Sequence, residues 1–229
     1  MIRIPFARLV ARVLLAAPVL LLGACATQVK PYDYTAYKQA KPASLLVLPP
    51  VNESPDVSAT GSVLAQTTLP LAEAGYYVLP VTLVDETLHQ NGVNSPEDAQ
   101  SLAPAKLREV FGADAVLYMK VKAYGSSYKV VASETAVALE ARLVDLRSGQ
   151  LLWQGVARAS SAENNGSNQG GLVGMLVKAV VEQIVNHSTD ASVRYAGIAD
   201  QRLLSAGHVN GLLYGPRSPS YGKDPVAPQ

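Results

Sequence analysis

The single cysteine of this chain, Cys25, lies in the surroundings that point most directly to a chemical reaction. It closes the run Leu-Gly-Ala-Cys at positions 22–25, directly after an apolar segment. This arrangement is typical of a bacterial lipobox, in which a signal peptidase cleaves after a small residue and the cysteine thiol carries a diacylglycerol. The sequence therefore predicts cleavage after Ala24 and lipid attachment at Cys25.

The residues before Cys25 have the composition of a secretory signal. Arg3, Arg8 and Arg12 form a positive region without acids, and the apolar run Val13–Leu22 follows them. A run of about ten residues is too short to cross a bilayer, which needs about twenty. An ordinary signal peptide with a chance cysteine remains an alternative, but a lone cysteine cannot pair within an exported chain.

Lipidation would remove that difficulty and determine the location of the protein. Two or more acyl chains hold a protein stably on a membrane, whereas one chain holds it only marginally. The second mature residue would be Ala26 and not aspartate. In enteric-type bacteria, aspartate at this position favours retention in the inner membrane. The sequence therefore predicts a lipid-anchored protein of the outer membrane, with its folded part in the periplasm.

The other residues with reactive side chains do not form a recognisable catalytic or ligand-binding pattern. His89, His187 and His208 are not at metal-ligand spacing from one another, so surface or helix-capping roles are predicted. The glycine-rich stretch 166–174 is not followed by the Lys-Ser/Thr pair of a phosphate-binding loop. No nucleophile elbow of the G-x-S-x-G type occurs. No metal, cofactor or catalytic residue is therefore predicted.

Two pairs of adjacent acids also receive a structural interpretation. Asp85 and Glu86, and likewise Glu97 and Asp98, lie near the expected N-termini of helices. Acids are stabilised there by the helix dipole. The sequence thus predicts a protein that is not an enzyme.

Charge and composition exclude further classes of protein. The chain has 229 residues, 48% of them hydrophobic, and a formal charge of +1. Removing residues 1–24 leaves 16 basic and 18 acidic residues, a net charge of −2. No basic stripe for nucleic acid stands out, nor does a polybasic run for anionic lipid. The length that remains suits one domain with tails.

Hydrophobic patterns predict an α/β fold of the α+β-like kind. A short apolar run, 44–48, ends at two prolines and is typical of a buried strand. Three longer segments alternate as antiparallel strands do, with a tight hairpin at 145–149 between the second and the third. The remaining predictions are a strand at 76–81, helices at 60–74, 82–90, 95–111 (divided at Pro104), 172–185 and 190–205, and the long strands at 115–124, 135–146 and 150–160.

The predicted organisation is a signal peptide at 1–24, a tether at 25–43, one domain at 44–208 and a tail at 209–229. The tether is either a flexible spacer or a segment that docks through its three tyrosines, 32, 34 and 37. The proline- and glycine-rich tail is predicted to be extended or disordered. The apolar helix 172–185 either packs on the sheet or joins subunits of a homo-oligomer, since Gly170, Gly171 and Gly174 permit close approach.

Several stretches of the mature chain together resemble a family of bacterial lipoproteins of unknown function, of which a meningococcal surface antigen is the familiar member. The family is similar in fold to the N-terminal domain of TolB, the periplasmic domain of CsgG and the activator LpoB. These proteins share a mixed sheet covered by helices. The stretches are Tyr-Asp-Tyr-Thr at 32–35, Leu-Pro-Pro-Val-Asn-Glu-Ser at 48–54, 71–78, 101–114, Arg-Leu-Val-Asp-Leu-Arg-Ser-Gly at 142–149 and Gly-Gly-Leu at 170–172.

This resemblance implies an assembly role and supplies no catalytic residues. Members are encoded with a CsgG-like lipoprotein and a small companion lipoprotein, which implies a shared envelope complex. The alternatives are an LpoB-like regulator of a peptidoglycan synthase and an export-related binding module. Regulation at long range needs reach, and the predicted tether spans at most about 60 Å when fully extended.

Overall fold

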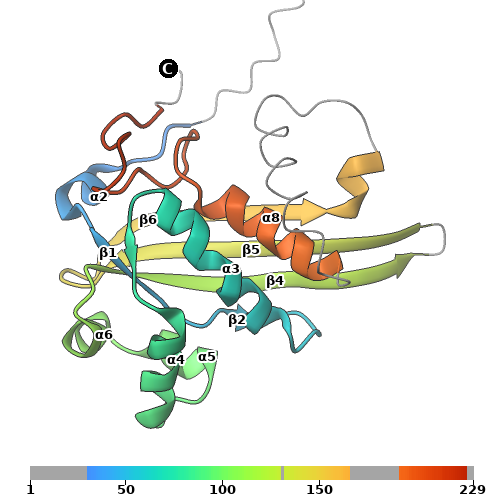
Figure 1. Ribbon diagram of the computed structural model, residues 1–229, viewed down its shortest axis with the longest axis horizontal. Helices are drawn as coiled ribbons and strands as arrows, with labels where there is room; N and C mark the ends of the chain where they lie inside the picture. Colours follow the sequence, from blue (N-terminus) through green and yellow to red (C-terminus); the bar gives the residue numbers. More distant parts are fainter. Residues whose placement is uncertain (1–29, 130–131, 166–190, 226–229) are drawn as a thin grey trace, which may run out of the picture. The chain divides into compact units, whose positions relative to one another are not determined.

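A mixed sheet of six strands lies at the centre of the structure, a computed structural model that describes residues 30–129, 132–165 and 191–225 (Figure 1). The strand order is β3-β1-β4-β5-β6, and β2 pairs with β4 beyond the end of β1. Strand β1 pairs in parallel with β3 and β4, and β2 pairs in parallel with β4. Strand β5 is antiparallel to both of its neighbours, β4 and β6. The strands are β1 Ser44–Val47, β2 Val51–Asn52, β3 Tyr77–Val78, β4 Ala115–Lys129, β5 Ala132–Asp145 and β6 Leu151–Ser160.

The helices begin and end largely where local sequence signals place them. Ser95 caps one helix by accepting a hydrogen bond from the Asp98 N–H, and Pro96 occupies the first turn. Gly112 ends another with a positive φ of 67°, which glycine adopts without strain. The helices are α2 Thr35–Ala40, α3 Ala59–Glu73, α4 Val81–Gln90, α5 Pro96–Ser101, α6 Pro104–Phe111, η1 Ser161–Asn165 and α8 Ala191–Leu204.

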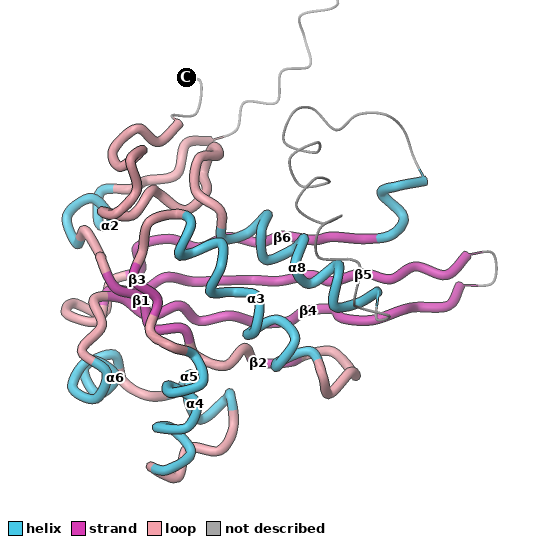
Figure 2. Tube along the Cα trace, viewed as in Figure 1, coloured by secondary structure: helices cyan, strands magenta, loops and turns pink. Residues whose placement is uncertain are grey.

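The sheet is buried on both faces at its β1 end. Successive residues of β1 enter different hydrophobic clusters, because side chains alternate between the faces of a strand. Leu45 and Val47 join the cluster beneath α2, α3 and α8, where α3 and α8 lie side by side (Figure 2). Leu46 and Leu48 join the cluster covered by α4, α5 and α6. The predicted α/β fold, a mixed sheet with helices packed on it, is confirmed.

Both ends of the compact unit, Tyr32–Pro225, fold against the domain. In the predicted tether, Tyr37 is buried and its hydroxyl lies 2.6 Å from that of Tyr76. The Tyr76 hydroxyl then donates to the Leu213 carbonyl at 2.6 Å. Burial raises the pKa of both tyrosines well above the ordinary value. From residue 32 onward the docked alternative for the tether is therefore confirmed.

The prediction of an extended or disordered tail is wrong for residues 210–225. Leu212 is 1% exposed, and the indole Nε1 of Trp153 donates to the Asn210 carbonyl. The Gly215 N–H and the Arg217 N–H donate to the carbonyls of Ala74 and Gly75. Proline and glycine prevent regular structure here, but backbone groups still find partners in the folded domain.

Some predicted features lie outside the described residues. These are the signal peptide with Ala24 and Cys25, the glycine-rich stretch 166–174, the apolar helix 172–185 and His187.

Asp114 joins the start of β1 to the hairpin after β5. Its Oδ2 accepts hydrogen bonds from the N–H groups of Ala43 and Ser44 and from the Ser44 hydroxyl, at 2.9–3.0 Å. Its Oδ1 lies 2.7 Å from Nη2 of Arg147. Burial raises the pKa of this carboxyl, but the hydrogen bonds and the arginine charge outweigh burial, so the pKa lies below its ordinary value.

We expect Asp114→Ala to lower the free energy of unfolding by about 2 kcal/mol at pH 7, because backbone donors lose their acceptor. When folding lowers the pKa of a carboxyl, its ionised form stabilises the folded protein. This stabilisation is complete above the pKa in the unfolded chain, about 3.9, and is lost as the pH falls through the pKa in the folded protein. The difference between variant and wild type should therefore shrink below pH about 4 in urea unfolding. Glu109→Ala, at an exposed acid of α6, is the control. A loss for Asp114→Ala that stays the same at every pH would contradict this role.

Candidate functional site

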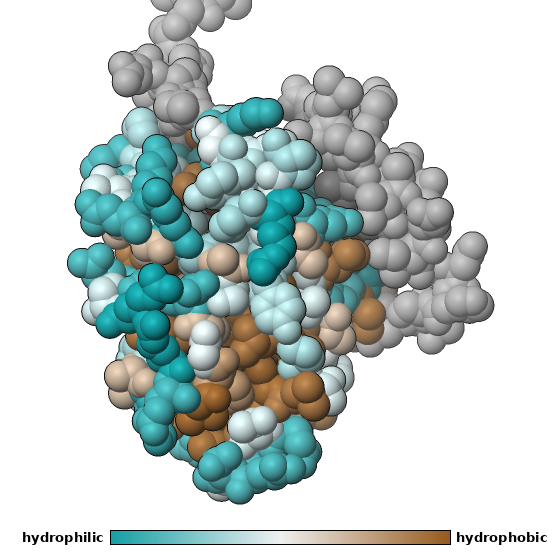
Figure 3. Space-filling view, turned by 60° about the vertical axis from the view of Figure 1, so that its left-hand side comes forward, coloured by the Kyte–Doolittle hydropathy of each residue, from teal (hydrophilic) through white to brown (hydrophobic). Residues whose placement is uncertain are grey.

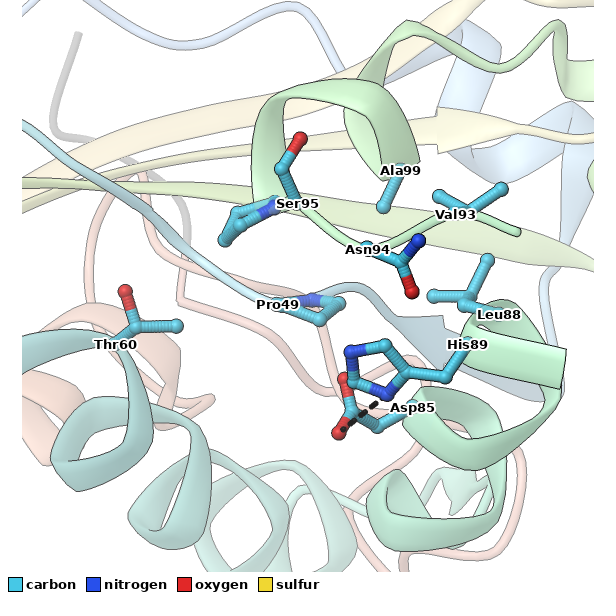
Figure 4. A pocket seen from close by; sticks show the side chains of 10 residues that line it. Pro49, Thr60, Asp85, Leu88, His89, Val93, Asn94, Ser95 and Ala99 are labelled. Atoms are coloured by element: carbon cyan, nitrogen blue, oxygen red, sulfur yellow. Dashed lines mark ion pairs between the residues drawn. The ribbon is translucent and has the colours of Figure 1, made fainter. Parts of the chain in front are cut away.

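A pocket of about 190 Å³ opens between α4, α5 and the segment that follows β1 (Figure 4). Its walls combine apolar side chains with a small number of polar groups, as ligand pockets commonly do. The lining residues are Pro49, Thr60, Asp85, Leu88, His89, Val93, Asn94, Ser95, Pro96 and Ala99.

His89 and Asp85 form an ion pair at this pocket. They lie one turn apart on α4, with His89 Nδ1 3.5 Å from Asp85 Oδ2, and their side chains are 46% and 44% exposed. A carboxylate next to an imidazole nitrogen can hold the ring in one orientation, as it does in general-base catalysis. The prediction of a surface position for His89 is confirmed, but the sequence did not indicate that His89 lines a pocket.

Among the described residues that line the pocket, no hydroxyl is hydrogen-bonded to His89 as the nucleophile of a catalytic triad would be. Ser95 lines the pocket, but its hydroxyl points away from His89 (Figure 4). The Ser95 Oγ also accepts the Asp98 N–H as the cap of α5. Nucleophilic catalysis needs the hydroxyl within hydrogen-bond reach of its base. The structure therefore does not bring Ser95 and His89 together as a nucleophile and its base.

The structure separates the other residues that the sequence singled out. His208 lies at an exposed position in the C-terminal segment and is not among the residues that line the pocket. Glu97 and Asp98 occupy the first turn of α5, as predicted. The prediction that Asp85 and Glu86 lie near a helix N-terminus is wrong. Because Pro80 caps α4, which starts at Val81, both acids fall in the middle of that helix.

Apolar side chains reach the surface around α4 and α6. Leu83 of α4 and Val110 of α6 are 64% and 47% exposed. Leu79, which follows β3, and Phe111 of α6 are partly buried against the same hydrophobic cluster. These four residues are called here the apolar surface. Figure 3 brings this side of the molecule forward and shows apolar side chains gathered in its lower half.

The apolar surface includes Leu79, which follows the edge strand of the sheet. Strand β3 ends the strand order and pairs with β1 alone among the described strands. The Tyr77 N–H donates to the Ala43 carbonyl and the Leu79 N–H to the Leu45 carbonyl, so the Val78 N–H faces away from β1. The C-terminal segment packs beside the start of this strand, with the Arg217 guanidinium over the Tyr77 ring. Unpaired edges next to apolar side chains are sites where other chains can bind. No sequence signal singled out Leu83 or Val110, because isolated apolar residues on short helices resemble core positions.

No helix in the described parts of the chain combines the length and hydropathy that crossing a bilayer requires. Nor do three or more metal-ligating acids, histidines or cysteines gather in those parts.

Comparisons with known proteins cover most of the chain. A family model described as "Putative lipoprotein GNA1162-like" matches residues 32–217. A relative from Neisseria meningitidis serogroup B (strain ATCC BAA-335 / MC58), named "Putative lipoprotein NMB1124/NMB1162", is 50% identical over 202 residues, which cover 88% of this chain and 93% of the relative.

Solved structures agree with these relationships. The crystal structure of lipoprotein GNA1162 from Neisseria meningitidis is 53% identical, with a TM-score of 0.51, covering 63% of this chain and 99% of that one. The LpoB C-terminal domain from Salmonella enterica is 20% identical with a TM-score of 0.39, covering 56% of this chain and 98% of that one. That second likeness is too distant to carry a functional argument. The resemblance expected from the sequence is confirmed, and the chain belongs to the GNA1162-like lipoprotein family.

Proposed function

We propose that this protein is an outer-membrane lipoprotein, anchored through acyl chains on Cys25, and a non-enzymatic component of a cell-envelope complex. Its partners would be other envelope lipoproteins, of the CsgG-like kind, that share the same membrane. The observation that carries the proposal is the apolar surface beside the edge strand β3. A complex of this kind needs a binding surface and no catalytic centre.

The composition of this surface supports a protein partner. Leu83 and Val110 expose large aliphatic side chains to water, although neighbouring positions of the same helices, Val84 and Leu107, are buried. Exposed apolar groups that join the rim of a core cluster commonly mark interaction sites. A partner that covers this region would bury the apolar area that Leu83 and Val110 expose.

The short link to the anchor favours partners in the same membrane. Six residues separate Cys25 from Tyr32, where the folded unit begins. That chain can span at most about 25 Å when fully extended, less than half of what the predicted tether allowed. An LpoB-like regulator must reach a synthase across the periplasm, so this alternative is less well supported than lateral assembly.

A comparison of three tagged, full-length proteins would test the proposal. The double variant Leu83→Ser/Val110→Ser removes the apolar surface, and Val156→Ser on β6, 76% exposed, is the control. Each protein is purified from outer membranes in mild detergent and its partners are quantified by mass spectrometry. We expect lipoproteins recovered with the wild type and the control to fall about tenfold or more with the double variant. Recovery of the wild type alone, as a monomer, would overturn the proposal, as would equal recovery with the double variant.

A further inference from the structure

The two ends of the folded unit meet on one side of the domain. The Tyr32 N–H donates to the Asn210 side chain at 2.9 Å, and the Tyr34 hydroxyl donates to the Gly211 carbonyl. The Arg217 Nη1 donates to the Ala43 carbonyl at 3.0 Å. In Figure 1, α2 and the C-terminal segment accordingly lie together. We call residues 32–43 and 210–225 together the terminal face.

The charge of the mature chain is divided unequally between this face and the rest. The terminal face carries four basic residues and two acidic residues, Asp33 and Asp224, a net charge of +2. Residues 44–209 carry eleven basic and sixteen acidic residues, a net charge of −5. In the terminal face itself the basic residues, all at exposed positions, are Lys38, Lys41, Arg217 and Lys223. Neither end alone is polybasic, so the concentration of positive charge arises only when the ends come together.

Tyrosines accompany these cations. The rings of Tyr32 and Tyr34 contact each other, with centroids 5.0 Å apart and planes tilted by 51°. Both residues are partly buried, as is Tyr214, while Tyr221 is 46% exposed. Burial raises the pKa of Tyr34 to about 12, so its hydroxyl stays protonated at physiological pH. Tyrosine has an apolar ring and a polar tip, which is why it is frequent at the level of lipid headgroups.

We propose that the terminal face lies against anionic phospholipid headgroups of the membrane that holds the anchor. This inference rests on the lipid anchor of the proposed function. The link from Cys25 enters the folded unit at Tyr32, on this face, so the anchor holds the face near the bilayer. Basic side chains are attracted to anionic lipid, and the acidic remainder of the domain is repelled from it. Leu79 and Phe111 of the apolar surface pack against the cluster on the other face of the sheet, and Leu83 and Val110 remain exposed to partners.

Lysine acetylation of the lipidated, full-length protein in nanodiscs would test the inference. One set of nanodiscs contains phosphatidylcholine alone and the other contains added phosphatidylglycerol. We expect acetylation of Lys38 and Lys223 to slow about fivefold with phosphatidylglycerol. This factor corresponds to the free energy with which anionic lipid attracts one lysine near the membrane surface. Lys106 on α6 should be unaffected, and high salt should remove the protection. Equal labelling of Lys38 and Lys223 in both kinds of disc would overturn the inference.

Two charge-matched variants sharpen the test. Lys38→Gln/Lys223→Gln removes two cations from the terminal face, and Lys106→Gln/Arg108→Gln removes two from α6. Only the first should abolish the effect of phosphatidylglycerol on acetylation of Lys41. Equal effects of the two variants would contradict a specific role of the terminal face. Failure of the wild type to enter any nanodisc would instead contradict the anchor, and hence the proposed function.

Discussion

Replacing Cys25 with serine should abolish incorporation of labelled palmitate and remove the protein from the outer-membrane fraction. Serine has nearly the same size as cysteine but lacks the thiol that accepts the diacylglycerol. The apolar run before it is about ten residues, half the length that spans a bilayer, so it cannot replace the acyl chains as a stable anchor. Palmitate labelling and separation of the two membranes would measure the change, which is expected to be complete.

Ala26→Ser is the matched control, because it places the same new residue beside the lipidation site and leaves the thiol. This variant should keep its label, and mass spectrometry should identify a diacylated N-terminal peptide that begins at residue 25. Palmitate incorporation that survives Cys25→Ser would show that the lipid lies elsewhere. An unmodified N-terminus in the wild type would favour the alternative of an ordinary signal peptide with a chance cysteine.

Asp200 is the second residue whose replacement should have a large effect. It lies in α8, has no exposed surface, and neither carboxylate oxygen has a hydrogen-bond partner among the described residues. Burial raises its pKa well above the ordinary value. A charged carboxylate without a partner is very costly in an apolar interior, so the group keeps its proton.

We expect Asp200→Asn to raise the melting temperature by about 5 °C at pH 7 and to change it little at pH 4. In the unfolded chain the carboxyl loses its proton near pH 3.9. The folded state keeps the proton, so its stabilising effect is complete below that pH and is lost as the pH rises toward the folded pKa. The gain arises in the unfolded wild-type chain, which is stabilised at pH 7 because its carboxyl can ionise there, whereas asparagine cannot ionise in either state. A gain of about 2 kcal/mol corresponds to this shift in a chain of this length.

Calorimetry between pH 4 and pH 8 would measure this effect. Glu97→Gln, at an exposed acid of α5, removes the same charge from the surface and should leave the wild-type pH dependence intact. If the asparagine variant melted at or below the wild-type temperature at pH 7, Asp200 would have to be stabilised by a partner group.

The regular elements could be predicted where local patterns are strong. Alternation placed the β5 residues Val137, Leu139, Ala141 and Leu143 on one buried face, as the structure confirms. The boundaries were less accurate. Strand β3 is shorter than predicted because α4 begins at Val81, directly after Pro80. Strand β4 continues past Tyr124, because backbone pairing with β5 extends the strand into a polar segment whose residues do not alternate between apolar and polar.

The candidate site could be predicted only in fragments. The sequence drew attention to His89 and Asp85 separately, although their spacing of four residues within the predicted helix 82–90 already put both on one helical face. Pro49 and Ser95 complete the pocket from other elements. Leu83 and Val110 could not be recognised as exposed, because periodicity in short helices does not reveal which side other elements cover.

The sequence by itself determined the alternating strands and most helix ends, and it alone predicts the export signal and the lipidation site, because each depends on neighbouring residues. Only the tertiary structure decided which elements pack together and which side chains they bury or leave exposed. The hydrogen bond from Tyr32 to Asn210 joins residues 178 positions apart, and such pairing leaves no local pattern. The same long-range packing folds the proline-rich tail, gathers the basic residues of the terminal face and encloses Asp200.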